Sequence, residues 1–507
     1  MYLVVALTGL AFALRVVGLD FQSLWRDEVD AIRFAGRPLA DLLQTFATPG
    51  QNGPLYYLLL RPWLEVAGGS EFALRFFSAA FGVLAVPLIY RLARRIWPRQ
   101  RGLALVAALV AATSPYLVWY GQEGKMYSLV VALALISMER YLAALEGGGW
   151  HRWLAYVAAT TAAFYVHLVA VLLVPVQFLA FFLQGRARRR ARWKPWLACM
   201  ALLIVPYLPL LAWQWRLLAA PAASGYAFVP LHDMLYSLVA SFSLGYFQAN
   251  LQWVLVLFVG LLLVSALCLK ERHSARAWLL LLAWLVVPAG LLFLVTLIRP
   301  MYTTRYLIFV LPAYLLLLAA GWGVVARRSR GLAAVWLAAL LVANGWGLWV
   351  QARTPFKADF RAATRYVVAG REAGDLILFQ IPYGRHSFDY YLARQGGEAV
   401  PEGGENRIFV PVVARRGLGR PPWAEGPYTN GGMAPAEVDR LMAELTAGRR
   451  TVWLVATEVA LWDARGLTQA WLEENARRVA EAHFERVDVY RYELPAEDLP
   501  ESLAPVE

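Results

Sequence analysis

The 507-residue chain is 60% hydrophobic and only 16% charged, with a mean hydropathy of +0.49. Soluble domains carry about 25% charged residues, so this composition excludes a soluble globular protein and indicates an integral membrane protein. The net charge of +13 comes from arginines in short loops between apolar segments. This pattern is typical of topology determinants and not of a nucleic-acid-binding surface, so we expect membrane lipids and no nucleic acid among the partners.

Apolar segments of the length that crosses a bilayer follow one another through the first 350 residues. The first starts at Met1 without a preceding basic region or a cleavage site, so it predicts a retained helix and not a signal peptide. We expect about eleven transmembrane helices, at residues 2–19, 73–94, 103–120, 127–145, 153–166, 168–184, 197–217, 250–269, 277–297, 304–325 and 332–350.

The loops between these segments alternate in charge. Every second loop is basic, beginning with the group Arg91, Arg94, Arg95, Arg99 and Arg101 and ending with ARRSR at 326–330. Because basic loops stay in the cytoplasm, the pattern predicts a multi-pass membrane protein with a cytoplasmic N-terminus. We expect the membrane to be a bacterial plasma membrane. The pattern also places the long loop 20–72 on the outer side.

The composition changes after Val350. Amphipathic helix-like stretches at 359–370, 387–395, 434–447 and 466–477 alternate with β-rich runs at 375–381, 407–413 and 451–457. This alternation predicts a small α/β domain outside the membrane. The sequence therefore divides into a transmembrane domain at 1–350, whose loop 20–72 carries interfacial helices, and an extracytoplasmic α/β domain at 351–507.

Two adjacent carboxylates lie in the first outer loop, in the stretch SLWRDEVD. Asp27 could cap a short interfacial helix, with Asp30 in its first turn and Trp25 as an interface anchor. Capping explains one acid more easily than the pair Asp27 and Glu28. A functional interpretation requires other polar groups at the same membrane face.

Such groups occur in the other outer segments. Each has a simpler alternative, because Arg75 and Arg305 could extend to lipid headgroups, and Lys125 and His167 could be ordinary loop residues. Ionisable groups in membrane segments are nevertheless functional candidates by default. The outer set consists of Arg75, Glu123, Lys125, His167, Arg299 and Arg305.

A base, several fixed cations and a lipid environment match glycosyl transfer from a lipid-linked sugar phosphate. A carboxylate would deprotonate an acceptor hydroxyl, and basic side chains would stabilise the leaving phosphate. No Walker A motif or strand-linked GxGxxG motif is found in the N-terminal region. A transporter or flippase of lipid-linked glycans is the main alternative, although the paired repeats and broken helices of transporters are not evident. A non-catalytic scaffold is a third.

The sequence resembles glycosyltransferase family 39 of the GT-C superfamily, which contains protein O-mannosyltransferases and aminoarabinose transferases. The resemblance follows family order over most of residues 10–320, and the C-terminal part also resembles bacterial members. It is carried by LRVVGLDFQSLWRDEVDAI, NGPLYYLLLRPWL, EFALRFFSAAFGVLAVPLIYRLAR, SPYLVWYGQEGKMYSLVVALAL, FYVHLVAVLLVPVQ and RYLIFVLPAYLLLLAAG.

The resemblance implies a mainly helical GT-C fold and inverting transfer from a polyprenyl-phosphate sugar to a protein, lipid or glycan acceptor. By position it implies catalytic roles for Asp27, Glu28 and Glu123. Arg75, Lys125 and Arg305 would bind the donor phosphate, and we add Arg299. We expect His167 and Tyr306 to contact substrate.

One segment departs from the family pattern. Many members have a His or Lys before a Pro-Pro-Leu segment, where this chain has Gln51, Asn52, Gly53, Pro54 and Leu55. A cation directed at the donor is missing there, which weakens the aminoarabinose interpretation. No cofactor is required by the sequence. A divalent metal bound by Asp27, Glu28, Glu123 and His167 remains an open alternative, because their spacing is not diagnostic.

Overall fold

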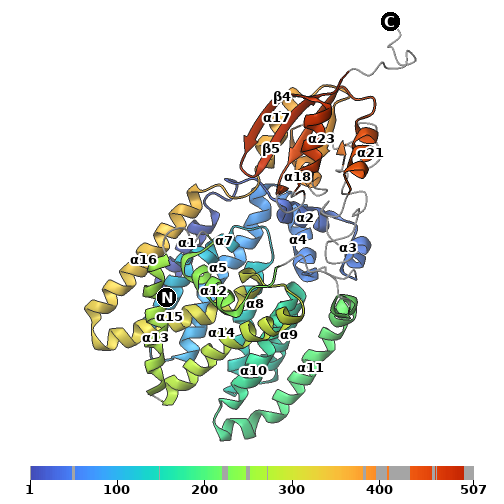
Figure 1. The fold of residues 1–507 in the computed structure, drawn as a ribbon. Helices are drawn as coiled ribbons and strands as arrows, with labels where there is room; N and C mark the ends of the chain where they lie inside the picture. Colours follow the sequence, from blue (N-terminus) through green and yellow to red (C-terminus); the bar gives the residue numbers. More distant parts are fainter. Residues whose placement is uncertain are drawn as a thin grey trace. The chain divides into compact units, whose positions relative to one another are not determined.

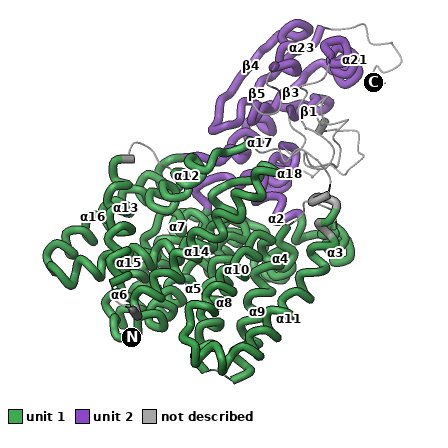
Figure 2. Tube along the Cα trace, turned by 60° about the horizontal axis from the view of Figure 1, so that its bottom comes forward, with its two compact units in different colours: residues 1–19, 34–354 green, residues 20–33, 355–507 purple. Residues whose placement is uncertain are grey.

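The computed structural model describes residues 2–47, 52–147, 149–219, 227–246, 252–270, 272–380, 384–395, 408–409, 434–459, 463 and 465–495. The chain forms two compact units (Figure 2). Unit 1 contains residues 1–19 and 34–354, and unit 2 contains residues 20–33 and 355–507. The first outer loop is therefore shared, because its residues 20–33 cluster with the C-terminal part of the chain.

All regular secondary structure in the described residues of unit 1 is helical (Figure 1). Its first half holds α1 (Tyr2–Val16), α3 (Leu39–Phe46), α4 (Pro54–Ala67), α5 (Glu71–Ile96), α6 (Arg101–Thr113), α7 (Pro115–Gly121), α8 (Tyr127–Leu145) and α9 (Trp150–Val166). Its second half holds η1 (Leu168–Leu172), α10 (Leu173–Phe182), α11 (Arg186–Ala219), α12 (Leu231–Leu244), η2 (Gln252–Val254), α13 (Leu255–Ser265), η3 (Ala266–Lys270), α14 (Arg272–Ile298), η4 (Thr304–Val310), α15 (Leu311–Arg328) and α16 (Arg330–Arg353).

Six helical stretches of the described chain are long and apolar enough to cross a membrane, or seven if the bent pair α6–α7 is one span. The chain is thus a multi-pass membrane protein. Each of the eleven predicted segments contains helix, but three of them form shorter apolar helices, at Tyr2–Val16, Leu168–Phe182 and Leu255–Lys270, and the predicted segment 153–166 is the 17-residue α9. Local breaks explain part of the difference between the eleven predicted spans and the six or seven that the structure shows in its described residues. Pro115 disfavours helical backbone at Ser114 and bends α6–α7 by 55°.

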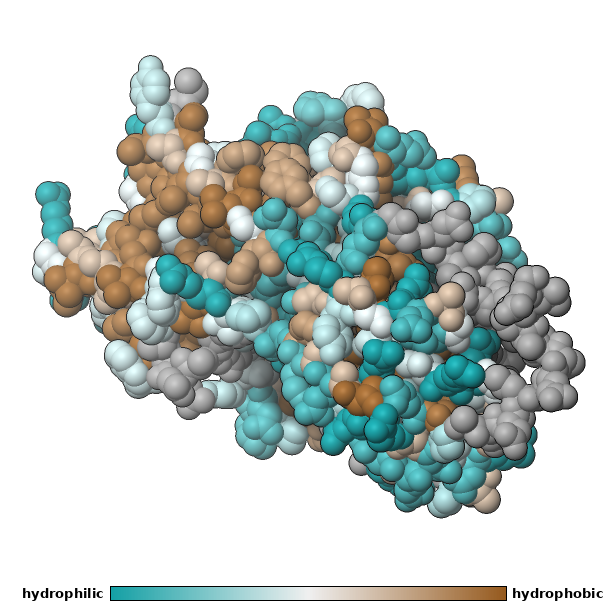
Figure 3. Space-filling view, turned by 90° about the horizontal axis from the view of Figure 1, so that it is seen from above, coloured by the Kyte–Doolittle hydropathy of each residue, from teal (hydrophilic) through white to brown (hydrophobic). Residues whose placement is uncertain are grey.

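The outer surface of unit 1 is rich in apolar side chains, as expected for helices that face lipid. Long apolar residues are exposed on several helices, and Figure 3 shows broad apolar areas on the face it presents. Examples are Leu202 and Leu208 on α11, Leu263 on α13, Leu294 on α14 and Val342 on α16.

A fully buried arginine lies within the first helix. Arg15 of α1 has no exposed surface, and its guanidinium donates to the carbonyl oxygens of Ala11, Ala111 and Ala112 at 3.1 to 3.3 Å. The last two carbonyls belong to the C-terminal turn of α6, where helical partners are missing because of the bend. Gly82 and Gly121 leave room for this side chain, since a Cβ at either position would come within about 3 Å of it.

We expect Arg15→Met to destabilise unit 1, because the substitution leaves buried carbonyl groups without donors. Each buried unsatisfied polar group costs about 1–3 kcal/mol, so the thermal midpoint of the purified protein should fall by several degrees. Arg99→Met, at an exposed arginine, serves as the control and should leave the midpoint unchanged. Equal midpoints for the two variants would contradict a bracing role for Arg15.

Unit 2 contains a five-stranded mixed sheet with the strand order β2-β1-β3-β5-β4. β1 (Leu376–Phe379) pairs in parallel with β2 (Ile408–Phe409) and β3 (Thr451–Ala456), whereas β5 (Val487–Glu493) runs antiparallel to β3 and to β4 (Arg477–Phe484). The described helices of this unit are α17 (Phe360–Gly370), α18 (Gly384–Arg394), α21 (Pro435–Thr446) and α23 (Leu467–Asn475), and α2 (Arg26–Gly36) begins here.

Helices cover both faces of the central strands, which explains their continuous apolar sequences. On one face, Leu378, Val452 and Leu454 join the buried side chains of α21 and α23 in one core. On the other face, α17 and α18 pack against the sheet, with Tyr366 against Trp453 and Phe388 against Phe379.

The predicted alternation of helix and strand is confirmed as a small mixed sheet with flanking helices. The predicted strand at 407–413 is described only at residues 408–409, and its remainder lies outside the described residues. Strands β4 and β5 were not predicted. They form a hairpin whose turn contains Arg486, with a φ of 55°. Buried and partly buried residues roughly alternate along β5, and the sequence VDVYRYE shows the matching alternation of side chains.

Candidate functional site

The acidic pair of the first outer loop lies at the start of α2, in unit 2. The helix begins at Arg26, so Asp27 and Glu28 occupy its first turn, and the backbone N–H groups of Glu28 and Val29 donate to the carbonyl of Trp25. Asp27 therefore lies inside the helix and is not its N-cap, the position that the capping interpretation gave it. Both acids still lie at the positive end of the helix dipole, which favours negative charge.

The two carboxylates have different surroundings. The Glu28 side chain is completely buried, and its Oε2 lies 2.9 Å from Nζ of Lys357, whose side chain is 6% exposed. The Asp27 side chain is 19% exposed and lies 3.5 Å from Nε of Arg26. A buried ion pair fixes geometry strongly, because separating the charges in a low dielectric is costly. Glu28 is thus anchored inside unit 2, and Asp27 is the more accessible acid.

Further contacts hold residues 22–28, which we call the DE segment, against α17, α18 and the chain that precedes α17. Gln22 Oε1 accepts hydrogen bonds from the backbone N–H groups of Phe356 and Lys357, each at 3.0 Å. The Tyr391 hydroxyl accepts from Leu24 N–H at 2.6 Å and from Ser23 Oγ at 3.1 Å. These groups are separated by more than 330 residues of sequence, so folding of the C-terminal part orders the backbone that presents Asp27.

The same segment places Arg33 of α2 in the electrostatic environment of Asp389. Burial raises the pKa of the Asp389 carboxyl, and the positive charges of Arg385 and Arg33 lower it. Arg385 also donates to Asp389 Oδ2 at 3.1 Å. The charge of Arg33 on α2 therefore acts on a carboxyl group of α18.

The basic candidates of unit 1 are positioned by α5. Arg75 is 2% exposed, and its Nη1 donates to the carbonyl of Leu19 at 2.6 Å, at the end of the N-terminal part of unit 1. One turn later, Ser78 donates to the carbonyl of Lys125 at 3.0 Å. The Lys125 ammonium in turn lies 3.4 Å from the hydroxyl of Tyr57 on α4. α5 thus holds Arg75 and the loop that carries Lys125.

A second group gathers around Tyr127, the first residue of α8. The Arg305 guanidinium lies 5.8 Å from the Tyr127 ring centroid, a cation–π distance. The His167 ring lies 6.1 Å from Tyr127 and 5.3 Å from Tyr306. Residues from three separate segments therefore meet here, and His167, Arg305 and Tyr306 were predicted as candidates.

His167 is almost completely buried, and neither ring nitrogen has a hydrogen-bond partner among the described residues. Buried polar atoms are normally paired, so such a position is a candidate for contact with a ligand.

Glu123 and Arg299 complete the candidates of unit 1. Glu123 is 2% exposed, its carbonyl accepts from Lys125 N–H at 2.7 Å, and both its charge and that of Arg305 act on the nearby Tyr120. Arg299 follows α14 directly and is half-buried, with its backbone N–H on the carbonyl of Val295.

The segment that departs from the family pattern packs tightly beside this group. Asn52 Oδ1 accepts a hydrogen bond from Leu168 N–H at 3.0 Å, directly after His167. Gly53 has a φ of 79°, and a Cβ there would come within 3.0 Å of the Val166 carbonyl and of Met126 Cε. Only glycine combines this backbone conformation with so close an approach. Asn52 and Gly53 therefore help to fix the turn that carries His167.

An apolar groove of about 510 Å³ lies close to this turn. Its walls come from α4, α9 and α11, and the Tyr165 hydroxyl on its border donates to the carbonyl of Pro206 at 2.8 Å. The groove begins close in sequence to the polar group, because Leu55 lies two residues after Gly53 and Tyr165 two residues before His167. It is lined by Leu55, Leu58, Val157, Ala158, Thr161, Ala162, Tyr165, Leu202 and Pro206.

The structure places the predicted residues in both units. Asp27 and Glu28 belong to unit 2, whereas the other candidates belong to unit 1, where His167, Arg305 and Tyr306 gather around Tyr127. Within the described parts of the chain, no three His, Cys, Asp or Glu side chains are arranged to hold a metal ion.

Several contributing residues were not predicted: Tyr57, Tyr127, Gln22, Lys357 and Tyr391. Lys357 could have been noticed, because it opens KADFRAATRYVV, a stretch of the C-terminal part that resembles bacterial members of the family.

Comparisons with known proteins agree with this architecture. Residues 51–213 match the family described as dolichyl-phosphate-mannose-protein mannosyltransferase. The structure of apo ArnT from Cupriavidus metallidurans, at 13% identity, aligns over 96% of this chain and 97% of its own, with a TM-score of 0.60. The same protein bound to undecaprenyl phosphate aligns over the same shares, with 14% identity and a TM-score of 0.57.

The oligosaccharyltransferase AglB from Archaeoglobus fulgidus, solved with an inhibitory peptide and a dolichol-phosphate, is also similar. It is 12% identical and aligns over 99% of this chain and 75% of its own, with a TM-score of 0.58. A sequence search of curated proteins found no match. The resemblance inferred from the sequence is therefore confirmed: residues 51–213 match the dolichyl-phosphate-mannose-protein mannosyltransferase family, and the fold is GT-C-like, similar to that of ArnT.

Proposed function

We propose that the protein is an inverting membrane glycosyltransferase that moves a sugar from a polyprenyl-phosphate donor to a hydroxyl group of a protein, lipid or glycan acceptor. The family match and the GT-C-like fold support this class of reaction. Two proteins with a similar fold have been solved with polyprenyl phosphates, ArnT with undecaprenyl phosphate and AglB with a dolichol-phosphate. We place the reaction on the outer face of a bacterial plasma membrane, from the alternation of basic loops.

The observation that carries the proposal is an apolar groove close to a polar turn. A polyprenyl phosphate has a long apolar chain and one anionic group, so its site must join an apolar surface to fixed cations. The groove offers the apolar surface. The cations come from the same unit: Lys125 lies 3.4 Å from the hydroxyl of Tyr57 on α4, which also lines the groove, and Arg305 lies by Tyr127. A flippase would also bind such a lipid, but no observation on the described residues favours transport.

In the proposed reaction, the Asp27 carboxylate accepts the proton of the acceptor hydroxyl. The acceptor oxygen then bonds to the anomeric carbon of the sugar from the face opposite the phosphate. The bond between that carbon and the phosphate oxygen breaks, and the electron pair leaves with the polyprenyl phosphate. Arg75, Lys125, Arg299 and Arg305 stabilise the negative charge that grows on the phosphate.

The different surroundings of the two acids support this division of roles. A general base must reach the acceptor proton, and Asp27 is partly exposed whereas Glu28 is completely buried. We therefore assign proton transfer to Asp27 and the positioning of its helix to Glu28. Glu123, buried beside Tyr120, is a further acidic residue to which we assign a catalytic role near the donor. No step requires a metal.

Filling the groove should impair use of the lipid donor. We expect Leu58→Trp, on the groove wall, to raise the KM for a polyprenyl-phosphate sugar by roughly tenfold or more. The larger side chain would displace part of the lipid chain, and burying an apolar group of side-chain size contributes about 1.5–3 kcal/mol. The measurement is the initial rate of sugar transfer against donor concentration in detergent.

Leu59→Trp is the matched control. Leu59 is the next residue on the same helix, is 41% exposed and does not line the groove. It should leave the KM for donor near its wild-type value. A similar KM for both variants would exclude the groove as the donor site, without affecting the assignment of Asp27.

A further inference from the structure

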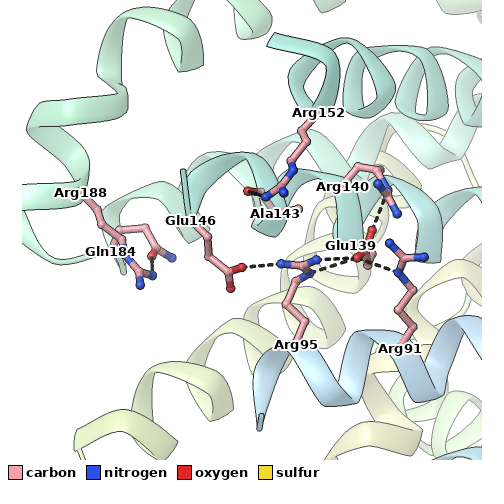
Figure 4. Close-up of polar contacts among 9 residues, drawn as sticks. All are labelled: Arg91, Arg95, Glu139, Arg140, Ala143, Glu146, Arg152, Gln184 and Arg188. Atoms are coloured by element: carbon pink, nitrogen blue, oxygen red, sulfur yellow. Dashed lines mark hydrogen bonds and ion pairs between the residues drawn. The ribbon is translucent and has the colours of Figure 1, made fainter. Parts of the chain in front are cut away.

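A cluster of arginines surrounds a buried glutamate far along α5 and α8 from the proposed donor site (Figure 4). Glu139 of α8 has a side chain only 2% exposed, and Oε1 accepts from Arg91 Nε at 3.0 Å and from Arg95 Nη2 at 2.8 Å. Its Oε2 lies 2.7 Å from Arg140 Nε. Arg95 also pairs with Glu146, in the turn after α8.

The charges in this cluster do not cancel. Three guanidinium groups share two carboxylates, so one positive charge remains on the side chains that contact one another. Like charges held close together are unfavourable unless an anion lies nearby. The same end of α5 also carries Arg94 in its last turn. The cluster therefore presents an excess of positive charge to an anion.

Glu139 contacts two of the arginines through only one nitrogen of each guanidinium group. It contacts Arg91 and Arg140 through Nε alone, and the Nη atoms of both have no hydrogen-bond partner within the described part of the chain. Figure 4 shows both guanidinium groups beside the Glu139 carboxylate. Two Nη edges are thus fixed by one buried carboxylate, and the planar guanidinium edge matches the oxygens of a phosphate.

The surface next to Arg91 identifies the kind of phosphate. Arg91 is 55% exposed at its side chain, and the exposed Leu84 lies seven residues earlier on the same face of α5, with the partly exposed Leu88 between them. α5 is one of the candidate membrane spans. This face therefore offers an apolar strip that ends at a basic group, which fits an acyl chain and the phosphate of its headgroup.

We propose that Arg91 and Arg140, held by Glu139, form a binding site for the phosphate of an anionic membrane phospholipid. This site is separate from the proposed donor site and does not depend on the proposed function. Basic residues attract anionic lipids strongly near a membrane surface, and two guanidinium groups in one site add a defined geometry to that attraction.

The test measures how phosphatidylglycerol raises the thermal midpoint of the purified full-length protein in detergent. We expect a rise with phosphatidylglycerol, little rise with phosphatidylcholine, and none with inorganic phosphate at the same concentration. In Arg91→Gln/Arg140→Gln, the apparent affinity for phosphatidylglycerol should fall by roughly 20-fold. Equal stabilisation by inorganic phosphate would identify a site for free anions and overturn the lipid assignment.

Two further variants separate a defined site from general surface charge. Arg99→Gln/Arg101→Gln removes the same charge from exposed arginines just beyond α5 and should keep the wild-type response. Arg91→Lys/Arg140→Lys preserves both charges but not the Nη edges, so it should fold normally and still respond weakly. The proposal is overturned if the Arg99/Arg101 variant loses the response equally, or if the lysine variant binds as the wild type does.

Discussion

Asp27→Asn should abolish nearly all sugar transfer in a protein that still folds and binds its lipid donor. The amide has the shape of the carboxylate but cannot accept the acceptor proton, and general base catalysis contributes typically 10²–10⁴-fold to a rate. We therefore expect kcat to fall by roughly that factor, with little change in the KM for donor. The assay is transfer of labelled sugar from a polyprenyl-phosphate donor, with donor binding measured separately on the same preparation.

Asp30→Asn is the matched control for this substitution. Asp30 lies one turn further along α2 and pairs with Arg33 at 3.3 Å, and both side chains are partly exposed. Such a pair contributes little to stability, so this variant should keep near-normal kcat. Near-normal turnover in Asp27→Asn would disprove the role of general base, and an equal loss in Asp30→Asn would attribute the effect to α2 as a whole.

Lys357→Met should be the most destabilising substitution in unit 2, with a loss of sugar transfer that follows from it. Removing one partner of a buried ion pair costs about 3–5 kcal/mol, because the remaining charge stays buried. Glu28 would then be left without its ammonium partner beneath Asp27. We expect a lower thermal midpoint and a fall in kcat that is larger than the change in the KM for donor. The cations that we assign to the donor phosphate belong to unit 1, whereas Lys357 belongs to unit 2.

A double variant shows whether the pair acts through charge. In Glu28→Gln/Lys357→Met no charge remains buried, so the midpoint should recover part of the loss of the single variant. Arg365→Met, at an exposed arginine of α17, should match the wild type in both midpoint and kcat. If Lys357→Met has the stability and kcat of the Arg365 variant, the ion pair does not position the DE segment.

The membrane architecture could be predicted from the sequence because apolar length and basic loops are local signals. Each predicted apolar segment contains helix, yet Pro115 and the 3₁₀ segments η1 and η3 interrupt three of them. Such breaks depend on caps and packing that the hydropathy of a segment does not report. The hairpin of β4 and β5 was missed for a related reason, since β4 is an exposed edge strand without a strong apolar pattern.

The candidate site could be predicted only in part. Charged residues in apolar surroundings, such as Arg75 and Arg305, are conspicuous in the sequence, and the structure shows the side chains around them. The partners Tyr57 and Tyr127 are ordinary aromatic residues in an aromatic-rich chain. Lys357 pairs with a residue more than 300 positions away, and no sequence period reports a contact of that separation. These contacts required the fold.

The most direct test follows the labelled sugar itself. Purified protein is incubated with a polyprenyl-phosphate sugar labelled in the sugar, together with membranes that supply acceptors, and the label is followed between lipid-phosphate and acceptor fractions. We predict that the wild type moves the label to acceptor and releases polyprenyl phosphate in equal amount, and that Asp27→Asn does neither. A label that stays on the polyprenyl phosphate with the wild type, or that crosses a sealed vesicle still attached to it, would contradict glycosyl transfer.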